Sequence, residues 1–136
     1  MTYLIDTDVN FDAMSSQPEA LGALEVAAEV SLRVSIITLG EVYDGVSRLD
    51  DPPDRLRQAE RFLQPFHIIN LDDQTMRIFG RIRTQLRQRG RIIGDMDILI
   101  AATAINQDLL LVTRNWKHFS QVDGLRFESP AQVLRN

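Results

Sequence analysis

Short apolar runs recur along this chain, and segments with helical character separate them. The runs cover residues 3–5, 34–37, 68–71 and 109–112, and a weaker one covers residues 125–127. Short strands that alternate with helices are typical of an α/β domain, in which a mainly parallel sheet lies between helix layers. Such sheets bind ligands beyond the carboxyl ends of their strands. The pattern therefore predicts four or five strands, with a functional site where the strands end.

The segments between these runs carry the signals of helices. Pro18 suits the first turn of a helix over residues 20–30. Apolar residues recur every three or four positions between Asp72 and Gly90, which predicts an amphipathic helix. Residues 98–105 are apolar on nearly every side, so this helix should be buried. Further helices are expected after residue 6, from Thr38, over residues 56–63 and from Pro130.

With 136 residues, the chain has the length of one ordinary domain, and we expect a single domain over residues 1–136. No apolar run approaches the roughly 20 residues of a membrane span, and Asp6 and Asp8 interrupt the stretch that a signal peptide would need. A cytoplasmic location is therefore expected. Without cysteine, the chain offers only oxygen and imidazole ligands to a metal. His67 and His118 stand outside any metal-ligand spacing, so structural or surface roles are expected for both.

The net charge of −4 is divided unevenly along the chain. Residues 1–54 hold eleven acidic and two basic side chains, whereas the remainder carries a net charge of +5. Six arginines lie between residues 77 and 91, among them Arg83, Arg87 and Arg89. Guanidinium groups bind phosphate in a bidentate way and stack on bases, so this run could guide a polyanion towards an acidic site. A solvated helix face explains the same run, and this alternative stays open.

Three acids occur where predicted elements begin or end. Asp6 directly follows the first apolar run, Glu41 lies in the helix expected from Thr38, and Asp97 begins the apolar helix. Hydrolysis of a phosphodiester requires neutralised charge on the phosphate and a nucleophilic water, and divalent metals supply both. Mg²⁺ and Mn²⁺ prefer carboxylate oxygens. If the fold joins them, these acids form a suitable metal site.

Each acid also has a structural interpretation. Glu41 follows Thr38 by three residues, which completes a capping box at a helix start. Asp97 could cap the helix after it, although Asp95 places a second acid where one cap suffices. Asp6 has the weakest structural interpretation, because a carboxylate after a buried strand costs desolvation energy unless something pairs with it.

Four segments carry a family resemblance. They are Tyr3-Leu-Ile-Asp-Thr7, Thr38-Leu-Gly-Glu-Val-Tyr-Asp-Gly45, Asp97-Ile-Leu-Ile-Ala-Ala-Thr-Ala104, and Leu111-Val-Thr-Arg-Asn115 followed by His118-Phe119. In this order and spacing, the segments resemble PIN-domain proteins, specifically the VapC-type ribonuclease toxins of bacterial or archaeal toxin–antitoxin pairs. The resemblance implies a PIN-like three-layer fold, with a parallel sheet flanked by helices.

The same resemblance implies an activity. Asp6, Glu41 and Asp97 would be metal ligands for Mg²⁺ or Mn²⁺, and metal-activated water would cleave RNA endonucleolytically. RNA is then the polyanion that the three arginines named above would bind. A small cognate antitoxin would inhibit the enzyme, and the chain would form a homodimer.

The chain departs from the family pattern at one corner of this site. Asn115 occupies the fourth acidic position, where its oxygen can orient a metal-bound water but brings no charge. Asp95 is a candidate to supply the missing acid. The hydroxyls of Thr7 and Thr113 could hold metal ligands or water in place, or serve as ordinary backbone caps.

Two other functions are considered. After a strand, Asp6-Thr-Asp8 resembles the nucleophile and acid pair of haloacid-dehalogenase-like phosphatases, in which Asp6 would attack phosphorus. Asn10 departs from that pattern, and Lys117 follows Asp97 instead of preceding it. The non-enzymatic alternative is an inert PIN-fold interaction domain whose acids serve only as caps and surface groups.

Overall fold

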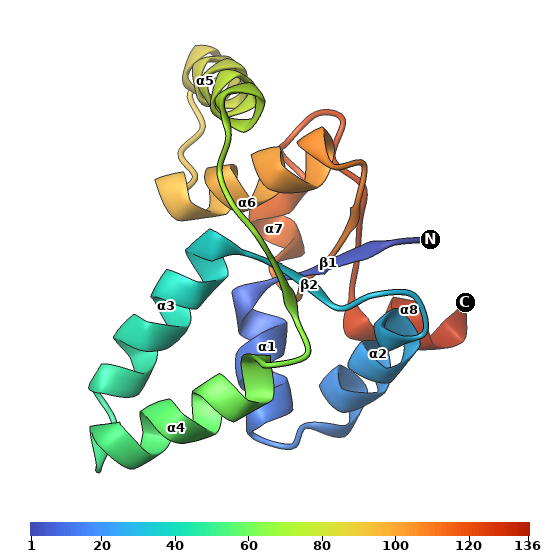
Figure 1. Ribbon diagram of the computed structural model, residues 1–136. Helices are drawn as coiled ribbons and strands as arrows, with labels where there is room; N and C mark the ends of the chain where they lie inside the picture. Colours follow the sequence, from blue (N-terminus) through green and yellow to red (C-terminus); the bar gives the residue numbers. More distant parts are fainter.

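Five short strands run through the middle of the molecule in the computed structural model, which describes residues 1–136 (Figure 1). They are β1 (Tyr3–Ile5), β2 (Arg33–Ser35), β3 (His67–Ile69), β4 (Leu110–Val112) and β5 (Phe127–Glu128). β4 pairs in parallel with β1 and β5, and β2 pairs in parallel with β3. β1 and β2 lie side by side, which gives the order β3-β2-β1-β4-β5. The predicted parallel sheet is confirmed, and its strands form two hydrogen-bonded groups.

Alternate residues of the central strands face two different apolar cores. Tyr3 and Ile5 belong to one core, while Leu4 between them belongs to the other and pairs in register with Leu111. Burying such a side chain contributes about 1.5–3 kcal/mol, so this alternation fixes which way each strand faces.

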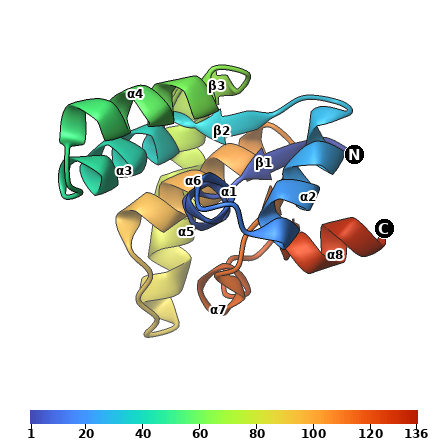
Figure 2. The ribbon, with the colours of Figure 1, turned by 90° about the horizontal axis from the view of Figure 1, so that it is seen from below.

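Helices form the outer layers on the two sides of the sheet (Figure 2). The first core takes side chains from α1 (Thr7–Met14), α2 (Pro18–Ala28), α3 (Ile36–Ser47), α4 (Pro52–Leu63) and α8 (Pro130–Arg135). The second takes them from α5 (Asp73–Gln88), α6 (Asp95–Asn106) and α7 (Trp116–Phe119). The three-layer arrangement predicted from the sequence is confirmed. None of the helices combines the length and apolar character that crossing a lipid bilayer requires.

Helix α3 begins two residues earlier than predicted. The side chain of Ser35 accepts a hydrogen bond from the backbone N–H of Ile37 at 3.1 Å, so Ser35 is the N-cap. The proposed capping box at Thr38 is therefore wrong, because Thr38 is buried inside the helix. Glu41 lies beyond the first turn, where its carboxylate is not needed for capping.

Helix α6 also begins before the predicted position. Gly94 is its N-cap and provides no side-chain hydrogen bond, so Asp97 lies in the first turn and does not cap the helix. Helix α5 agrees with the sequence. Asp72 accepts from the backbone N–H of Thr75 at 2.8 Å, and Gly90 takes a positive φ of 67° just beyond the last turn.

Candidate active site

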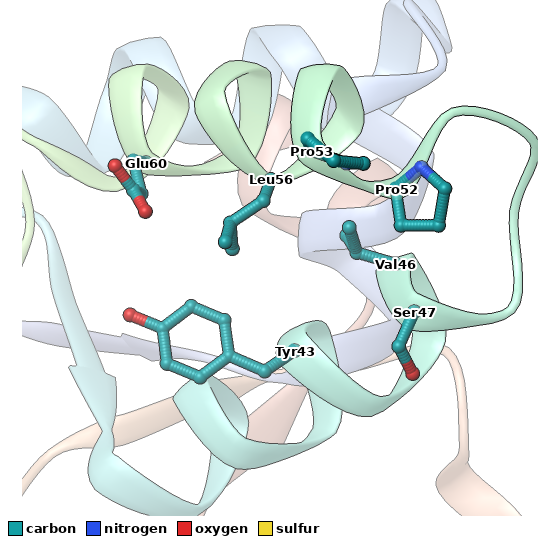
Figure 3. Close-up of a pocket in the computed structure, with 7 residues that line it drawn as sticks. All are labelled: Tyr43, Val46, Ser47, Pro52, Pro53, Leu56 and Glu60. Atoms are coloured by element: carbon teal, nitrogen blue, oxygen red, sulfur yellow. The ribbon is translucent and has the colours of Figure 1, made fainter.

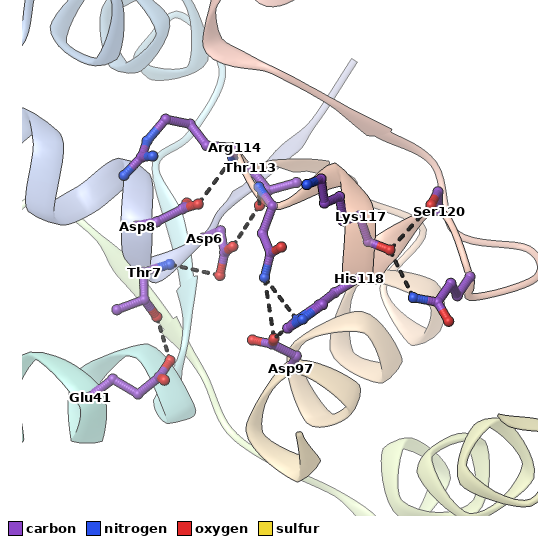
Figure 4. Close-up of polar contacts among 12 residues, drawn as sticks. Asp6, Thr7, Asp8, Glu41, Asp97, Thr113, Arg114, Lys117, His118 and Ser120 are labelled. Carbon is purple, nitrogen blue, oxygen red and sulfur yellow. Dashed lines mark hydrogen bonds and ion pairs between the residues drawn. The ribbon is translucent and has the colours of Figure 1, made fainter. Parts of the chain in front are cut away.

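Asp6 lies at the carboxyl end of β1, beside the end of β4. Because the two strands pair in parallel, the residues that follow them meet at one level, and Thr113 Oγ1 donates to Asp6 Oδ2 at 2.7 Å (Figure 4). The backbone N–H of Thr7 donates to Asp6 Oδ1 at 2.8 Å. Only 4% of Asp6 is exposed. Its carboxylate is therefore buried and held in a fixed orientation.

Glu41 reaches the same place from α3. The hydroxyl of Thr7 donates to Glu41 Oε1 at 2.6 Å. The Oγ1 atom of Thr7 also lies 3.0 Å from Oγ1 of Thr38. Thr7 thus contacts Asp6 through its backbone and Glu41 through its side chain. Thr7 therefore links the starts of α1 and α3 to one site.

The third acid, Asp97, faces the site from the first turn of α6. Its Oδ2 lies 2.8 Å from His118 Nδ1 and 3.5 Å from Asn115 Nδ2. The backbone N–H of Asn115 donates to Thr113 Oγ1 at 2.9 Å, which ties this corner to the one at Asp6. Figure 4 shows Asp6, Glu41 and Asp97 bordering one space.

His118 is a site residue that the sequence interpretation missed. Its contact with Asp97 joins residues 21 positions apart on different helices, so no local spacing could reveal it. The only signal was its place in the segment after β4, three residues beyond Asn115. The expected structural role is therefore incomplete, because His118 contacts a predicted metal ligand.

The acids of this site raise one another's pKa. Burial, followed by the charge of Asp8, raises the pKa of Asp6 to about 8, against the hydrogen bonds from Thr113 and Thr7. Burial also raises the pKa of Glu41, and the charges of Asp97 and Asp8 add to this effect. Such a concentration of carboxylates is stable as anions only when a positive charge lies among them.

Asp8 is a fourth acid at this site, and the sequence singled it out only for the phosphatase alternative. Its Oδ2 accepts the backbone N–H of Arg114 at 3.1 Å, while its Oδ1 is buried without a hydrogen-bond partner. The Arg114 side chain does not supply that partner, because its guanidinium pairs with Asp12. A buried carboxylate oxygen without a donor is suited to a cation.

These residues fit a hard divalent cation in chemical type. All the acids offer carboxylate oxygens, which Mg²⁺ and Mn²⁺ prefer. No three of the side chains converge closely enough to hold one ion together. Mg²⁺ usually keeps several waters and takes only one or two protein carboxylates, so this spacing is compatible with it.

Asp95 is not brought to the other acids. Arg83 Nε donates to Asp95 Oδ1 at 2.9 Å, and the Asp95 side chain is 57% exposed. Side chains two positions apart on a helix point about 200° apart, so Asp95 turns away when Asp97 faces the site. The suggestion that Asp95 replaces the missing acid is therefore wrong.

The arginine candidates are divided by the structure. Arg83 pairs with Asp95 and Arg89 pairs with Asp123, so both guanidiniums already have a carboxylate partner. A hollow of about 360 Å³ between α5 and the start of α6 is lined by the Arg83–Asp95 pair and by Arg87 and Arg91, which have no ion-pair partner. Of the three predicted residues, Arg87 has the surroundings most suited to an incoming phosphate.

An apolar groove of about 450 Å³ lies away from these acids, between α3 and α4 (Figure 3). Tyr43 and Leu56 project into it from opposite sides, and 43% of Tyr43 is exposed. The other lining residues are Val46, Ser47, Pro52, Pro53 and Glu60. Glu60 is the only charged residue in its lining, and a single carboxylate without basic neighbours cannot hold a phosphate, so this groove is not a second nuclease site.

Comparison with known proteins places the chain among nucleases. The ribonuclease VapC2 of Rickettsia felis is 33% identical over 95% of this chain and 98% of its own length. The tRNA(fMet)-specific endonuclease VapC of Shigella flexneri is 27% identical over 94% of this chain and 97% of its own. The crystal structure of VapBC2 from Rickettsia felis, bound to a DNA fragment from its promoter, superposes with a TM-score of 0.87. There the identity is 32%, and 95% of this chain and 98% of the other are covered.

The family model for the PIN domain matches residues 3–125. The matched segment contains all the acids that border the site and the residues that orient them. On the sequence match and the shared fold together, this chain belongs to the PIN-domain family.

Proposed function

We propose that this chain is a divalent-metal-dependent endoribonuclease that acts as the toxin of a toxin–antitoxin pair. The observation that carries the proposal is the meeting of Asp6, Glu41 and Asp97, from three distant segments, around one space at the strand ends. The names of the relatives, a ribonuclease and an endonuclease, support RNA cleavage. The cytoplasmic location expected from the sequence belongs to the same proposal, because the RNA substrate is there.

Each acid has a defined part in this proposal. Mg²⁺ or Mn²⁺, when bound, neutralises charge on the phosphate and activates the attacking water. Asp6 is fixed for ligation by Thr7 and Thr113. Asp97 would bind from the opposite side of the space, and Glu41, whose pKa is raised, is suited to accept a proton from the water.

The RNA strand would approach along the start of α6. Arg87 and Arg91 line a hollow there, and neither is engaged in an ion pair with an acid. Guanidinium groups bind phosphate in a bidentate way, so the strand would be held on the basic side while a neighbouring phosphate lies among the acids.

A partner protein is part of the proposal. A similar solved structure is a toxin–antitoxin complex from Klebsiella pneumoniae, and we propose an antitoxin partner for this chain as well as a homodimer. The apolar groove between α3 and α4 leaves Tyr43 and Leu56 partly in water when the chain is alone. Exposed apolar surface of this kind is a feature of proteins that work in complexes.

The test uses purified chain freed of any partner, with labelled RNA as substrate. We expect cleavage with Mg²⁺ or Mn²⁺, none in EDTA, and loss of at least two orders of magnitude of rate in Asp97→Asn. Asp108→Asn is the matched control, because it removes the same charge just before β4, at the end of that strand opposite to the site. We expect it to cleave at nearly the wild-type rate.

Cleavage in EDTA would contradict the metal-dependent mechanism. No cleavage of any RNA by the metal-loaded wild type would favour the inert interaction domain instead. Equal loss of activity in the two variants would show that the result reflects overall charge and not the site.

A further inference from the structure

The carboxylate of Asp97 meets two side-chain nitrogens from the segment after β4. The contacts come from His118 at 2.8 Å and from Asn115 at 3.5 Å, and both reach the same oxygen, Oδ2. The side chains of Asp97 and His118 are 23% and 44% exposed, so neither is free to reorient without losing contacts. The two donors hold one oxygen of the carboxylate and leave the other, Oδ1, facing the site.

The number of available protons fixes the direction of these hydrogen bonds. An imidazole nitrogen carries a proton or offers a lone pair, and an ionised carboxylate only accepts. The contact between His118 Nδ1 and Asp97 Oδ2 therefore requires the proton on Nδ1. Asn115 Nδ2 lies 2.9 Å from that nitrogen but cannot donate to it once it is protonated. In the amide orientation of the structure, Nδ2 donates to Asp97 Oδ2, and in the opposite orientation the amide oxygen would accept from His118 Nδ1 and so hold the imidazole against Asp97.

The segment that carries both donors is firmly anchored. Phe119 is fully buried in the second core, next to His118 in sequence. The backbone N–H of Phe119 donates to the carbonyl of Asn115 at 3.3 Å, and Gln121 Nε2 donates to the carbonyl of Lys117 at 2.8 Å. α7 therefore holds the imidazole and the amide in place before any ligand arrives.

We propose that His118 and Asn115 are positioning residues that fix Asp97 through Oδ2 and thereby present Oδ1 to the divalent cation. The inference rests on the proposed function only in taking Asp97 as a cation ligand. It gives Asn115 a role that the sequence did not suggest, since its amide contacts both Asp97 and His118. Partners of this kind typically contribute tenfold to a hundredfold to metal affinity.

The alternative is that His118 only packs between α7 and α6. Substitutions that move the hydrogen-bond donor distinguish this packing role from the positioning role. Asparagine places its amide nitrogen where Nδ1 of histidine lies, glutamine places it near Nε2, and leucine keeps bulk without a donor. If the donor at the Nδ1 position matters, His118→Asn retains metal affinity while His118→Gln and His118→Leu lose it. If only packing matters, affinity follows bulk.

The experiment is a Mn²⁺ titration of purified chain without RNA, followed by electron paramagnetic resonance of the free ion. We expect His118→Asn to bind within about threefold of the wild type, and His118→Gln and His118→Leu to bind about tenfold to a hundredfold more weakly. His67→Asn is the control and should match the wild type, because His67 is exposed on β3. Thermal unfolding in EDTA verifies that each variant folds. If His118→Leu does not fold, the comparison of asparagine with glutamine decides alone.

Wild-type affinity in His118→Gln would overturn the proposal, as would a His118→Asn variant that binds as weakly as His118→Gln. If the wild type itself binds no Mn²⁺, the metal-dependent function and this inference fail together. A wild type that binds Mn²⁺ but shows no dependence on the donor position overturns the inference alone.

Discussion

Gly40 and Gly45 lie on the same helix, α3, but their surroundings differ. A Cβ atom added at Gly40 meets nothing within 4 Å, whereas one added at Gly45 lies 2.8 Å from Cζ of Phe11. Phe11 packs against the first core, so its ring cannot move away freely. The glycine at position 45 is therefore required by the close approach of α1 and α3, and the one at position 40 is not.

Alanine substitutions at these two positions should have opposite effects on stability. Gly40→Ala should raise the free energy of unfolding by roughly 0.5–1 kcal/mol, because alanine favours the helix. Gly45→Ala gains the same propensity but must displace Phe11, and overpacking costs about 1–3 kcal/mol. Urea denaturation followed by circular dichroism measures both. A Gly45→Ala variant as stable as Gly40→Ala would show that Phe11 moves without cost.

At the same scale, the sequence indicated which acids border one space better than it indicated the groups that orient them. Asp6, Glu41 and Asp97 stand beside strand or helix ends in segments with a family pattern, so their meeting followed from the fold. His118 could not be found, because its partner lies on another helix. Asp95 was misjudged because its direction depends on where α6 begins, and Gly94 left that start unmarked by any side-chain cap.

Helix α5 and the turn after it carry the arginine run, and ion pairs divide the run into paired and unpaired guanidiniums. Replacing Arg87 and Arg91 together by glutamate should weaken RNA binding and lower its dependence on salt, because phosphate contacts release counterions. The measurement is fluorescence anisotropy of labelled RNA at several salt concentrations, with Asp97→Asn as the background to prevent cleavage. Affinity should fall by about tenfold or more.

The matched control replaces Arg57 and Arg61 on α4 by glutamate. These two arginines line a different hollow, which has no apolar residue in its lining. We expect little change in affinity there. An equal loss of RNA affinity in both double variants would mean that only net charge matters. Unchanged RNA affinity in the Arg87 and Arg91 variant would show that these arginines are solvated surface residues without a role in binding.

The ends of the elements were the least predictable part of the fold. The apolar run over residues 34–37 predicted a strand throughout, but the side-chain cap at Ser35 ends the strand and starts α3. Isoleucine suits both strands and buried helices, so Ile36 and Ile37 carry no signal that separates them. In contrast, α5 matched its prediction because Asp72 and Gly90 mark both of its ends.

For the whole molecule, the buried acids couple stability to pH and to metal. The pKa of Asp6 rises from 3.8 to about 8 on folding, mainly through burial, and the pKa values of Asp8 and Glu41 rise as well. Between pH 4 and pH 8 the unfolded chain has therefore lost protons that the folded chain keeps. Rising pH then favours unfolding, by about 1.4 kcal/mol per pH unit for each such proton.

In EDTA, the melting temperature should therefore fall between pH 5.5 and pH 8 and level off above that range. Differential scanning fluorimetry across this range measures the effect. Asp6→Asn should flatten the curve, because its side chain cannot ionise, and excess Mn²⁺ should raise the wild-type melting temperature most at the alkaline end. A wild-type curve in EDTA that rises towards pH 8 would contradict the assignment of buried, partly protonated acids.

The hydrogen bond from Thr113 to Asp6 joins residues 107 positions apart, and β1 finds its paired strand only in β4. During synthesis, Asp6 is therefore made 107 residues before Thr113, whose hydroxyl helps to hold its carboxylate in place. A nascent chain that has not yet reached β4 lacks the geometry of the site, so the ribosome must pass β4 before Asp6 takes its working orientation.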